Sequence, residues 1–125
     1  MLNPTSPLPL KDPTLFRQAN CIDGKWVQAD NGKTLTVADP ATGEAIGEVP
    51  ALGAPETRRA IEAASRAYPK WRSMLARERA TILRKFSDLM LANTDDLALI
   101  MTAEQGKPLA ESKGEITYSA SFIEW

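Results

Sequence analysis

The chain has 125 residues, which allows one domain at most, and 43% of them are hydrophobic, enough to form a core. Its 15 basic and 16 acidic residues give a net charge of -1, so nothing in the charge balance indicates nucleic acid or an acidic membrane surface as a partner. With one cysteine and no histidine, an internal disulfide is excluded and the commonest general base and metal ligand is missing. We find no bilayer-spanning apolar run and no secretory or mitochondrial leader, and therefore expect a cytoplasmic protein.

The first sixteen residues are rich in proline, with Pro4, Pro7, Pro9 and Pro13. Proline lacks a backbone N–H and restricts the residue before it to extended conformations. We therefore expect residues 1–16 to form an extended arm that is partly disordered unless it docks on a partner.

Residues 17–50 carry turn signals between short alternating segments. Asp23-Gly24 is a strong hairpin signal, because a type I′ turn needs positive φ at both central positions. Further reversals are expected at Asp30-Asn31-Gly32 and at Pro40-Ala41-Thr42-Gly43. Short strands are expected at residues 21–22, 25–27, 34–37 and 45–49. The region is predicted to be a β-hairpin or meander that is marginal alone.

From residue 53 to residue 125 the apolar spacing becomes helical. Pro55 and Glu56 suit the first turn of a helix, which we expect to stop at Pro69. The next helix carries one apolar stripe, formed by Ile82, Leu83, Phe86, Leu89 and Met90. The charges of residues 77–85 alternate in sign and are interpreted as an ordinary exposed face.

Two further helices complete the prediction of about four to five. Thr94 is expected to cap the third helix, which should end at a left-handed Gly106. Its predicted buried residues are Leu97, Ile100 and Met101. Pro108 opens the last helix, whose final residues favour burial and include Phe122 and Trp125. Because no glycine, proline or basic turn closes this helix, we expect the polypeptide to be cut within it.

Chemistry-bearing residues are few. Cys21 is predicted to be a small packed or edge residue, because a catalytic thiolate needs a base or a cationic partner. The Gly106-Lys107 pair lacks the strand, second glycine and Ser or Thr of a phosphate loop. Glu111 and Glu115 lie on one helix face beyond Lys107 and are expected to form an ion-pair cluster. We therefore assign no catalytic and no cofactor-binding residue.

The chain nevertheless resembles the start of the aldehyde dehydrogenase superfamily, over residues 15–125. The matching stretches include Ile22-Asp23-Gly24-Lys25-Trp26, Asp39-Pro40-Ala41-Thr42-Gly43-Glu44 and Glu104-Gln105-Gly106-Lys107-Pro108-Leu109-Ala110-Glu111. The last stretch, with Gly114-Glu115-Ile116 and Phe122-Ile123-Glu124-Trp125, is similar to the succinate-semialdehyde branch. Asp39 replaces the usual Asn, and both residues can hydrogen-bond locally in a turn.

This resemblance implies an α+β segment, in which residues 17–125 are the incomplete amino-terminal portion of a Rossmann-like NAD(P)-binding domain. That portion divides into a hairpin region (17–50) and helices (53–125). A full-length member would oxidise succinate semialdehyde to succinate with NADP or NAD, and would form a homo-oligomer. The family's nucleophile, glutamate, asparagine and ribose-binding lysine all match positions beyond Trp125. The 125-residue chain alone is therefore expected to be inactive and to bind no cofactor.

The resemblance also implies a monovalent cation site, formed by a backbone carbonyl of Val37 or Ala38 and by the carboxylate of Glu104. Such hard oxygen ligands suit the cation. Glu stands where relatives often have Asp, and a simple helix-end role for Glu104 is an equal alternative. The alternative for the whole chain is a naturally truncated, non-catalytic helical module that associates through exposed apolar faces. In either case, self-association of the isolated chain is expected.

Overall fold

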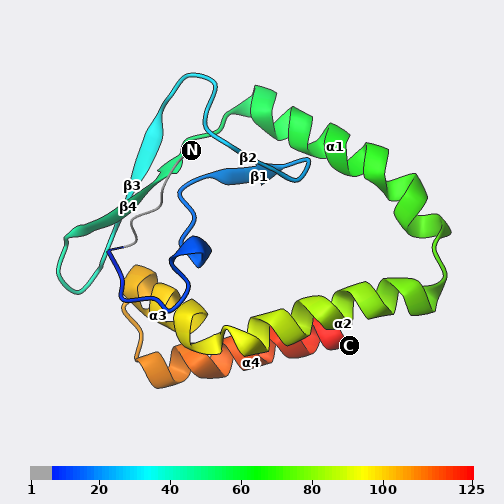
Figure 1. The fold of residues 1–125 in the computed structure, drawn as a ribbon. Coiled ribbons are helices and arrows are strands. Elements are labelled where there is room, and N and C mark those ends of the chain that lie inside the picture. Colours follow the sequence, from blue (N-terminus) through cyan, green and yellow to red (C-terminus); the bar gives the residue numbers. More distant parts are fainter. Residues whose placement is uncertain (1–6) are drawn as a thin grey trace.

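The computed structural model describes residues 7–125 and consists of two β-hairpins followed by four α-helices (Figure 1). The elements are the 3-10 helix η1 (Pro13–Leu15), the strands β1 (Asn20–Ile22), β2 (Lys25–Val27), β3 (Thr34–Ala38) and β4 (Ala45–Pro50), and the helices α1 (Ala54–Ser73), α2 (Ala76–Ala92), α3 (Thr94–Gln105) and α4 (Leu109–Glu124). In Figure 1 the hairpins and α1 lie on one side, and α2, α3 and α4 on the other. The predicted α+β class is confirmed.

The two hairpins form separate two-stranded antiparallel sheets, β1–β2 and β3–β4, and no pairing joins β2 to β3 within residues 7–125. Asp23 and Gly24 have φ of 54° and 70°, which confirms the type I′ turn. Gly32 and Gly43 also have positive φ, at the other two predicted reversals. The β3–β4 register is irregular between Val37 and Ala38.

Helix α1 is joined to the turn that contains Asp30 by the carboxylate of Glu56, which also caps the start of the helix. Glu56 is 3% exposed, and its Oε2 accepts from the backbone N–H of Gly53 at 3.1 Å. Its Oε1 accepts from the backbone N–H of Asp30 at 3.0 Å, and this donor is the main reason that the pKa of Glu56 lies below its ordinary value. Arg59, one turn further on, donates to both carboxylate oxygens of Asp30. The hairpin region and α1 are thereby held together.

The predicted stop at Pro69 is wrong, because α1 continues through it to Ser73. A proline inside a helix removes one backbone hydrogen bond and strains the preceding turn. The surrounding residues 64–70 are all exposed, so water can satisfy the freed carbonyl. Trp71 consequently lies in the last turn of α1.

Arg79 differs from the exposed charged face predicted for residues 77–85. It is half-buried, and its guanidinium donates to the carbonyl oxygens of Arg72 and Met74, both at 3.2 Å. These carbonyls belong to the end of α1, where intrahelical donors are lacking. Arg79 therefore closes the corner between α1 and α2.

The third helix has a different cap from the predicted one. Asn93 occupies the N-cap without a side-chain cap bond, and the hydroxyl of Thr94 instead donates backward to the carbonyl of Leu91 at 2.7 Å. The buried residues of α3 are Asp96 and Ala98. The predicted buried residues Leu97, Ile100 and Met101 are half-buried.

Helices α2, α3 and α4 pack through small residues. Ala98, Ser112 and Ala120 are at most 1% exposed, which allows the helix axes to approach closely. The hydroxyl of buried Ser87 donates to the carbonyl of Ala120 at 2.9 Å, and the hydroxyls of Thr102 and Ser112 lie 2.8 Å apart. These hydrogen bonds satisfy polar atoms that would be costly to bury alone.

The predicted apolar stripe of α2 remains largely uncovered. Four of its five residues are 40 to 53% exposed, namely Ile82, Leu83, Phe86 and Leu89. The end of α4 is likewise exposed, with Phe122 at 64% and Trp125 at 103%. Several of the largest apolar side chains among residues 7–125 are therefore exposed, including Phe86, Phe122 and Trp125, whereas Phe16 is buried.

The α3–α4 corner generates a stability prediction. Gly106 has φ of 74°, as expected for its left-handed cap, and a Cβ there would lie 2.8 Å from Cγ of Pro40. We expect Gly106→Ala to lower the free energy of unfolding by about 1–3 kcal/mol, through backbone strain and this contact. Urea unfolding followed by circular dichroism measures the change. The matched control is Gly114→Ala, because a Cβ there meets nothing within 4 Å.

The control should be neutral or stabilising by up to about 1 kcal/mol, since alanine is the better helix former. Equal effects of the two substitutions would contradict the role assigned to the corner.

Candidate functional site

The segment before β1 is anchored on helix α3 by one buried carboxylate. Asp96 is 6% exposed, and its two oxygens accept from the backbone N–H groups of Lys11 and Asp12 at 3.0 and 2.8 Å. The carboxylate of Asp12 in turn accepts from the N–H of Thr14 and so caps η1 at its N-terminal end. The predicted extended arm thus contains a 3-10 turn, and its residues 1–6 lie outside the described residues.

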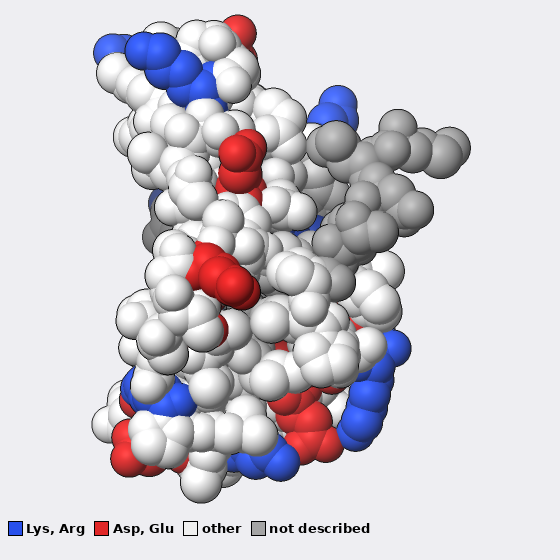
Figure 2. Space-filling model, turned by 90° about the vertical axis from the view of Figure 1, so that its left-hand side faces the viewer, with Lys and Arg blue, Asp and Glu red and all other residues white. Residues whose placement is uncertain are grey.

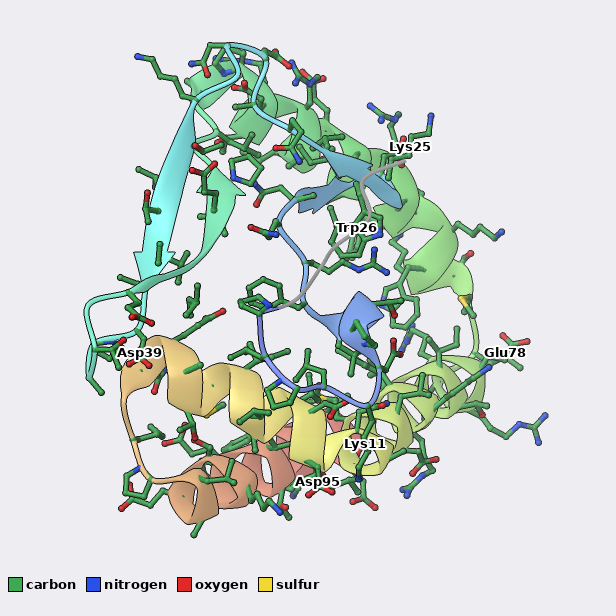
Figure 3. The ribbon with its side chains drawn as sticks, turned by 60° about the vertical axis from the view of Figure 1, so that its left-hand side comes forward. Lys11, Lys25, Trp26, Asp39, Glu78 and Asp95 are labelled. Carbon is green, nitrogen blue, oxygen red and sulfur yellow. The ribbon has the colours of Figure 1, made fainter. Side chains whose placement is uncertain are left out.

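Beyond this anchor, the same segment reaches both hairpins. Phe16 is 5% exposed, and a Cβ at Gly47 of β4 would lie 2.9 Å from Cζ of its ring. The guanidinium of Arg17 lies 4.7 Å from the ring centroid of Trp26 in β2, in cation–π geometry. Residues 11–17, hereafter the strap, therefore connect the helices to the hairpins. Figure 3 shows Lys11 and Asp95 at the helix end of this segment and Trp26 at the hairpin end.

Beside Asp96, the carboxylate of Asp95 is shared by two lysines. Lys113 of α4 and Lys11 of the strap approach its oxygens at 2.7 and 2.9 Å. The hydrogen bond from Lys113, with that from Lys11, lowers the pKa of Asp95 to about 2. All three side chains are at least 46% exposed, so solvent screens the pair energies.

An apolar pocket of about 490 Å³ lies between the strap and three helices. It is lined by Leu15 of η1, Phe86, Leu89, Met90 and Asn93 of α2, Leu97 of α3, and Ile116 of α4. Its one amide, Asn93 Nδ2, already donates to the carbonyl of Leu89 at 2.8 Å. The pocket therefore suits an apolar group and offers no charged side chain to a ligand.

Cys21 is exposed on β1 and borders a second pocket of about 400 Å³, between the first hairpin and α1. The α1 side of that pocket consists of alanines, namely Ala60, Ala63, Ala64 and Ala67. The one ionisable neighbour in the lining is Asp23, an acidic group that disfavours a thiolate, and the lining contains no cation. Cys21 is an edge residue, as predicted, and nothing in its surroundings supports a nucleophilic role.

The Gly106-Lys107 corner does not have the geometry of a phosphate loop. Gly106 ends α3 and packs against Pro40, so this glycine is occupied by a helix corner. The ammonium of Lys107 pairs with the carboxylate of Glu115, which confirms the Glu115 part of the predicted ion-pair cluster, whereas no ion pair of Glu111 is found among residues 7–125. No parallel strand precedes the corner, whereas a phosphate loop requires one.

The two segments of the implied cation site are brought close by the same corner. Pro40 lies two residues after the end of β3 at Ala38, and Gly106 lies two residues after Glu104. Pro40 and Gly106 are in contact, so the two segments are neighbours. Val37 is half-buried, whereas Ala38 and Glu104 are exposed. Among residues 7–125 no cluster of three or more His, Cys, Asp and Glu side chains could hold a metal ion. A site of backbone carbonyls stays a prediction.

Surface charge does not define a site on the face that Figure 2 presents. There the basic and acidic side chains are scattered among uncharged ones, without a broad patch of one sign. None of the helices in the described part of the chain is long and apolar enough to cross a membrane.

Comparison with known proteins shows the family to which the chain is similar. Residues 26–125 match the model of the aldehyde dehydrogenase family. The chain is 65% identical over 116 residues to a glutarate-semialdehyde dehydrogenase of Pseudomonas aeruginosa, covering 93% of this chain and 24% of that protein. It is 59% identical over 116 residues to a succinate-semialdehyde dehydrogenase [NADP(+)] of Escherichia coli, with the same coverage of 93% and 24%.

A solved structure gives the same result. The crystal structure of a succinate-semialdehyde dehydrogenase from Burkholderia pseudomallei superposes with a TM-score of 0.92 at 61% identity, over 94% of this chain and 24% of that one. The chain belongs to the aldehyde dehydrogenase family. It spans about a quarter of the length of the curated relatives that it matches, at their amino-terminal end.

The Asp95 cluster predicts a pH dependence. A folded-state pKa of about 2 lies below the ordinary value of 3.8, so the ionised form stabilises the fold above pH 4 and this contribution is lost as pH falls towards 2. We expect the melting temperature of wild type to exceed that of Asp95→Asn at pH 7, and the difference to shrink between pH 4 and pH 2. Thermal unfolding across this range checks it. A constant difference would contradict the assignment, and added salt should reduce the difference at pH 7.

The buried anchor generates a second prediction. Asp96→Asn leaves one backbone N–H facing an NH₂ group, so we expect a loss of about 1.5–3 kcal/mol in the free energy of unfolding. Hydrogen exchange should rise at the amides of Lys11 and Asp12, the two groups bound in the wild type. Asp88→Asn on exposed α2 is the control and should change neither measurement. Unchanged protection at Lys11 and Asp12 would refute the anchor.

Proposed function

We propose that this chain is the amino-terminal part of an NAD(P)-dependent semialdehyde dehydrogenase that oxidises succinate semialdehyde to succinate. The observation that carries the proposal is the 59 to 65% identity, over 93% of the chain, to relatives named as succinate- and glutarate-semialdehyde dehydrogenases. The NADP(+) in the name of the Escherichia coli relative supports a nicotinamide cofactor. Glutarate semialdehyde is the first alternative substrate to compare.

Within such an enzyme, residues 7–125 act as scaffold. They offer no thiolate environment and no phosphate loop, so they hold neither the reacting aldehyde nor the dinucleotide. Their contribution is to present helix faces to the remaining polypeptide, which supplies the nucleophile and the cofactor site. The carbonyls of Val37 or Ala38 and the carboxylate of Glu104 form the proposed monovalent cation site. A cytoplasmic homo-oligomer is proposed for the whole protein.

A chimera tests whether this chain can serve as the amino-terminal part of a semialdehyde dehydrogenase. The chain is joined to the part of the Pseudomonas aeruginosa relative that follows the matched segment, and NAD(P)H formation is measured with succinate and glutarate semialdehydes. We expect turnover by the chimera and none by the 125-residue chain alone, because the chain lacks an activated nucleophile. A folded chimera without turnover would refute the proposal that this chain serves as the amino-terminal part of such a dehydrogenase. Turnover by the isolated chain would refute its scaffold role.

The second candidate is the non-catalytic helical module, which is favoured by the exposed apolar residues of α2 and α4. Intact-mass measurement of the endogenous protein separates the two candidates. The chain of 13.7 kDa covers 24% of the Pseudomonas aeruginosa relative, so an endogenous protein with about four times this mass supports the dehydrogenase. A native product that ends at Trp125 supports the module.

A further inference from the structure

The strap is attached to the helices mainly through one carboxylate. Asp96 is 6% exposed and accepts hydrogen bonds from the backbone N–H groups of Lys11 and Asp12 at 3.0 and 2.8 Å. The ion pair between Lys11 and Asp95 lies beside it, but both side chains are more than half exposed, so water weakens the attraction. Leu15 adds an apolar contact that is half-buried. Loss of the Asp96 acceptor would therefore release this end of the strap.

The other end of the strap belongs with the hairpins. The ring of Phe16 is 5% exposed and packs against β4. The next residue but one, Gln18, accepts a hydrogen bond from the backbone N–H of Glu48 through its side-chain oxygen, at 2.7 Å. Helix α1 is held to the same region by the carboxylate of Glu56. Residues 11–73, hereafter the hairpin body, are therefore connected to one another without the help of α2, α3 or α4.

The strap also keeps its own local structure. The backbone N–H groups of Leu15 and Phe16 donate to the carbonyls of Asp12 and Pro13, at 3.1 and 3.3 Å. The side chain of Asp12 accepts from the N–H of Thr14 at 2.9 Å. Because all of these partners lie within the strap, η1 can stay formed when the strap leaves the helices.

Residues 76–124, hereafter the helical body, hold together by contacts of their own. The buried hydroxyl of Ser87 donates to the carbonyl of Ala120 at 2.9 Å, and the hydroxyls of Thr102 and Ser112 lie 2.8 Å apart. These groups all belong to α2, α3 and α4. Detaching the strap therefore leaves this packing in place.

A short extended segment joins the two bodies. Met74 and Leu75 have ψ of 149° and 146°, between the end of α1 and the start of α2, and Leu75 is 65% exposed. Figure 1 shows α1 and α2 diverging from this corner to opposite sides of the molecule. The guanidinium of Arg79 keeps the two helix ends together there. Extended residues in water can change φ and ψ without disturbing packed elements, which is the property of a hinge.

From these contacts we infer that Asp96 is a latch. When it releases Lys11 and Asp12, the hairpin body swings away from the helical body about the extended segment. The second junction, the ring of Pro40 against Gly106, involves a residue without a side chain and offers little surface to hold the closed form. The opening is a local event that costs less free energy than unfolding the helical body. It is a property of the chain under either candidate function.

Distance measurements by double electron–electron resonance test the latch on the full 125-residue chain. Cys21, the single cysteine, is exposed on β1 and takes one nitroxide label. Lys85→Cys, at an exposed position of α2, takes the other. Labelled chain is diluted into unlabelled chain, so that only distances within one molecule are recorded. We expect one narrow distribution with Asp96 present, and in Asp96→Ala a distribution at least twice as wide with a longer component.

Asp95→Ala is the matched control, because Asp95 lies in the same helical turn as Asp96 and is exposed. It removes two ion pairs but no buried acceptor, so the distribution should keep its width. A second label pair, Cys21 with Lys70→Cys on α1, lies within the hairpin body and should be unaffected by Asp96→Ala. An unchanged width in Asp96→Ala would overturn the latch, as would equal broadening by Asp95→Ala or of the second label pair.

Hydrogen exchange of the unaltered chain in low denaturant gives a test that needs no substitution. We expect the amides of Lys11 and Asp12 to be protected at least tenfold less than that of Ala120, and to depend less on denaturant, because they open while the helices stay folded. Equal protection with equal denaturant dependence would overturn the latch. Circular dichroism of Asp96→Ala should retain the helical signal, and its loss would overturn the latch by showing that Asp96 supports the helices themselves.

Discussion

The Asp96 carboxylate is the group on which the arrangement of the described residues depends. It accepts hydrogen bonds from the backbone N–H groups of Lys11 and Asp12. These two N–H groups lie outside the strands and helices and therefore need another acceptor. From this anchor the strap continues to Phe16, packed on β4, and to Arg17, stacked on Trp26 of β2. Neither hairpin packs extensively against α2, α3 or α4. The buried side chain of Asp96 at the start of α3 and the approach of Pro40 to Gly106 therefore join the helices to the hairpins.

This arrangement leaves the layer formed by α2, α3 and α4 exposed on two sides. The α2 stripe faces outward around the pocket, and the Tyr118–Phe122 pair of α4 lies on the opposite side. A layer of this kind is suited to lie between other parts of a protein, because burying only one face would leave large apolar side chains in water. Membership of the aldehyde dehydrogenase family, at a quarter of the length of the curated relatives, agrees with that role.

Two sequence features that could suggest chemistry have structural surroundings instead. Cys21 borders a pocket whose helical side is alanine, and Gly106-Lys107 is used for a helix corner and an ion pair. Each of these features could be judged from residue types, since a thiolate needs a cationic neighbour and a phosphate loop needs a strand. The pocket could not be foreseen, because its lining combines residues from Leu15 to Ile116.

Local rules that act within a few residues were enough to predict the Asp23-Gly24 turn, the left-handed Gly106 and the apolar stripe of α2. The sequence by itself determined these features because backbone conformation and helical periodicity are local properties. Tertiary structure alone decided that α1 passes through Pro69, that Arg79 closes the α1 end and that Asp96 holds the strap. Lys11 and Asp12 lie far from Asp96 in the sequence, and the carbonyls that Arg79 binds are available only because α1 ends at that corner. Pro69 stays within α1 because the surrounding turn is exposed to water. Side-chain identity reveals none of these three facts.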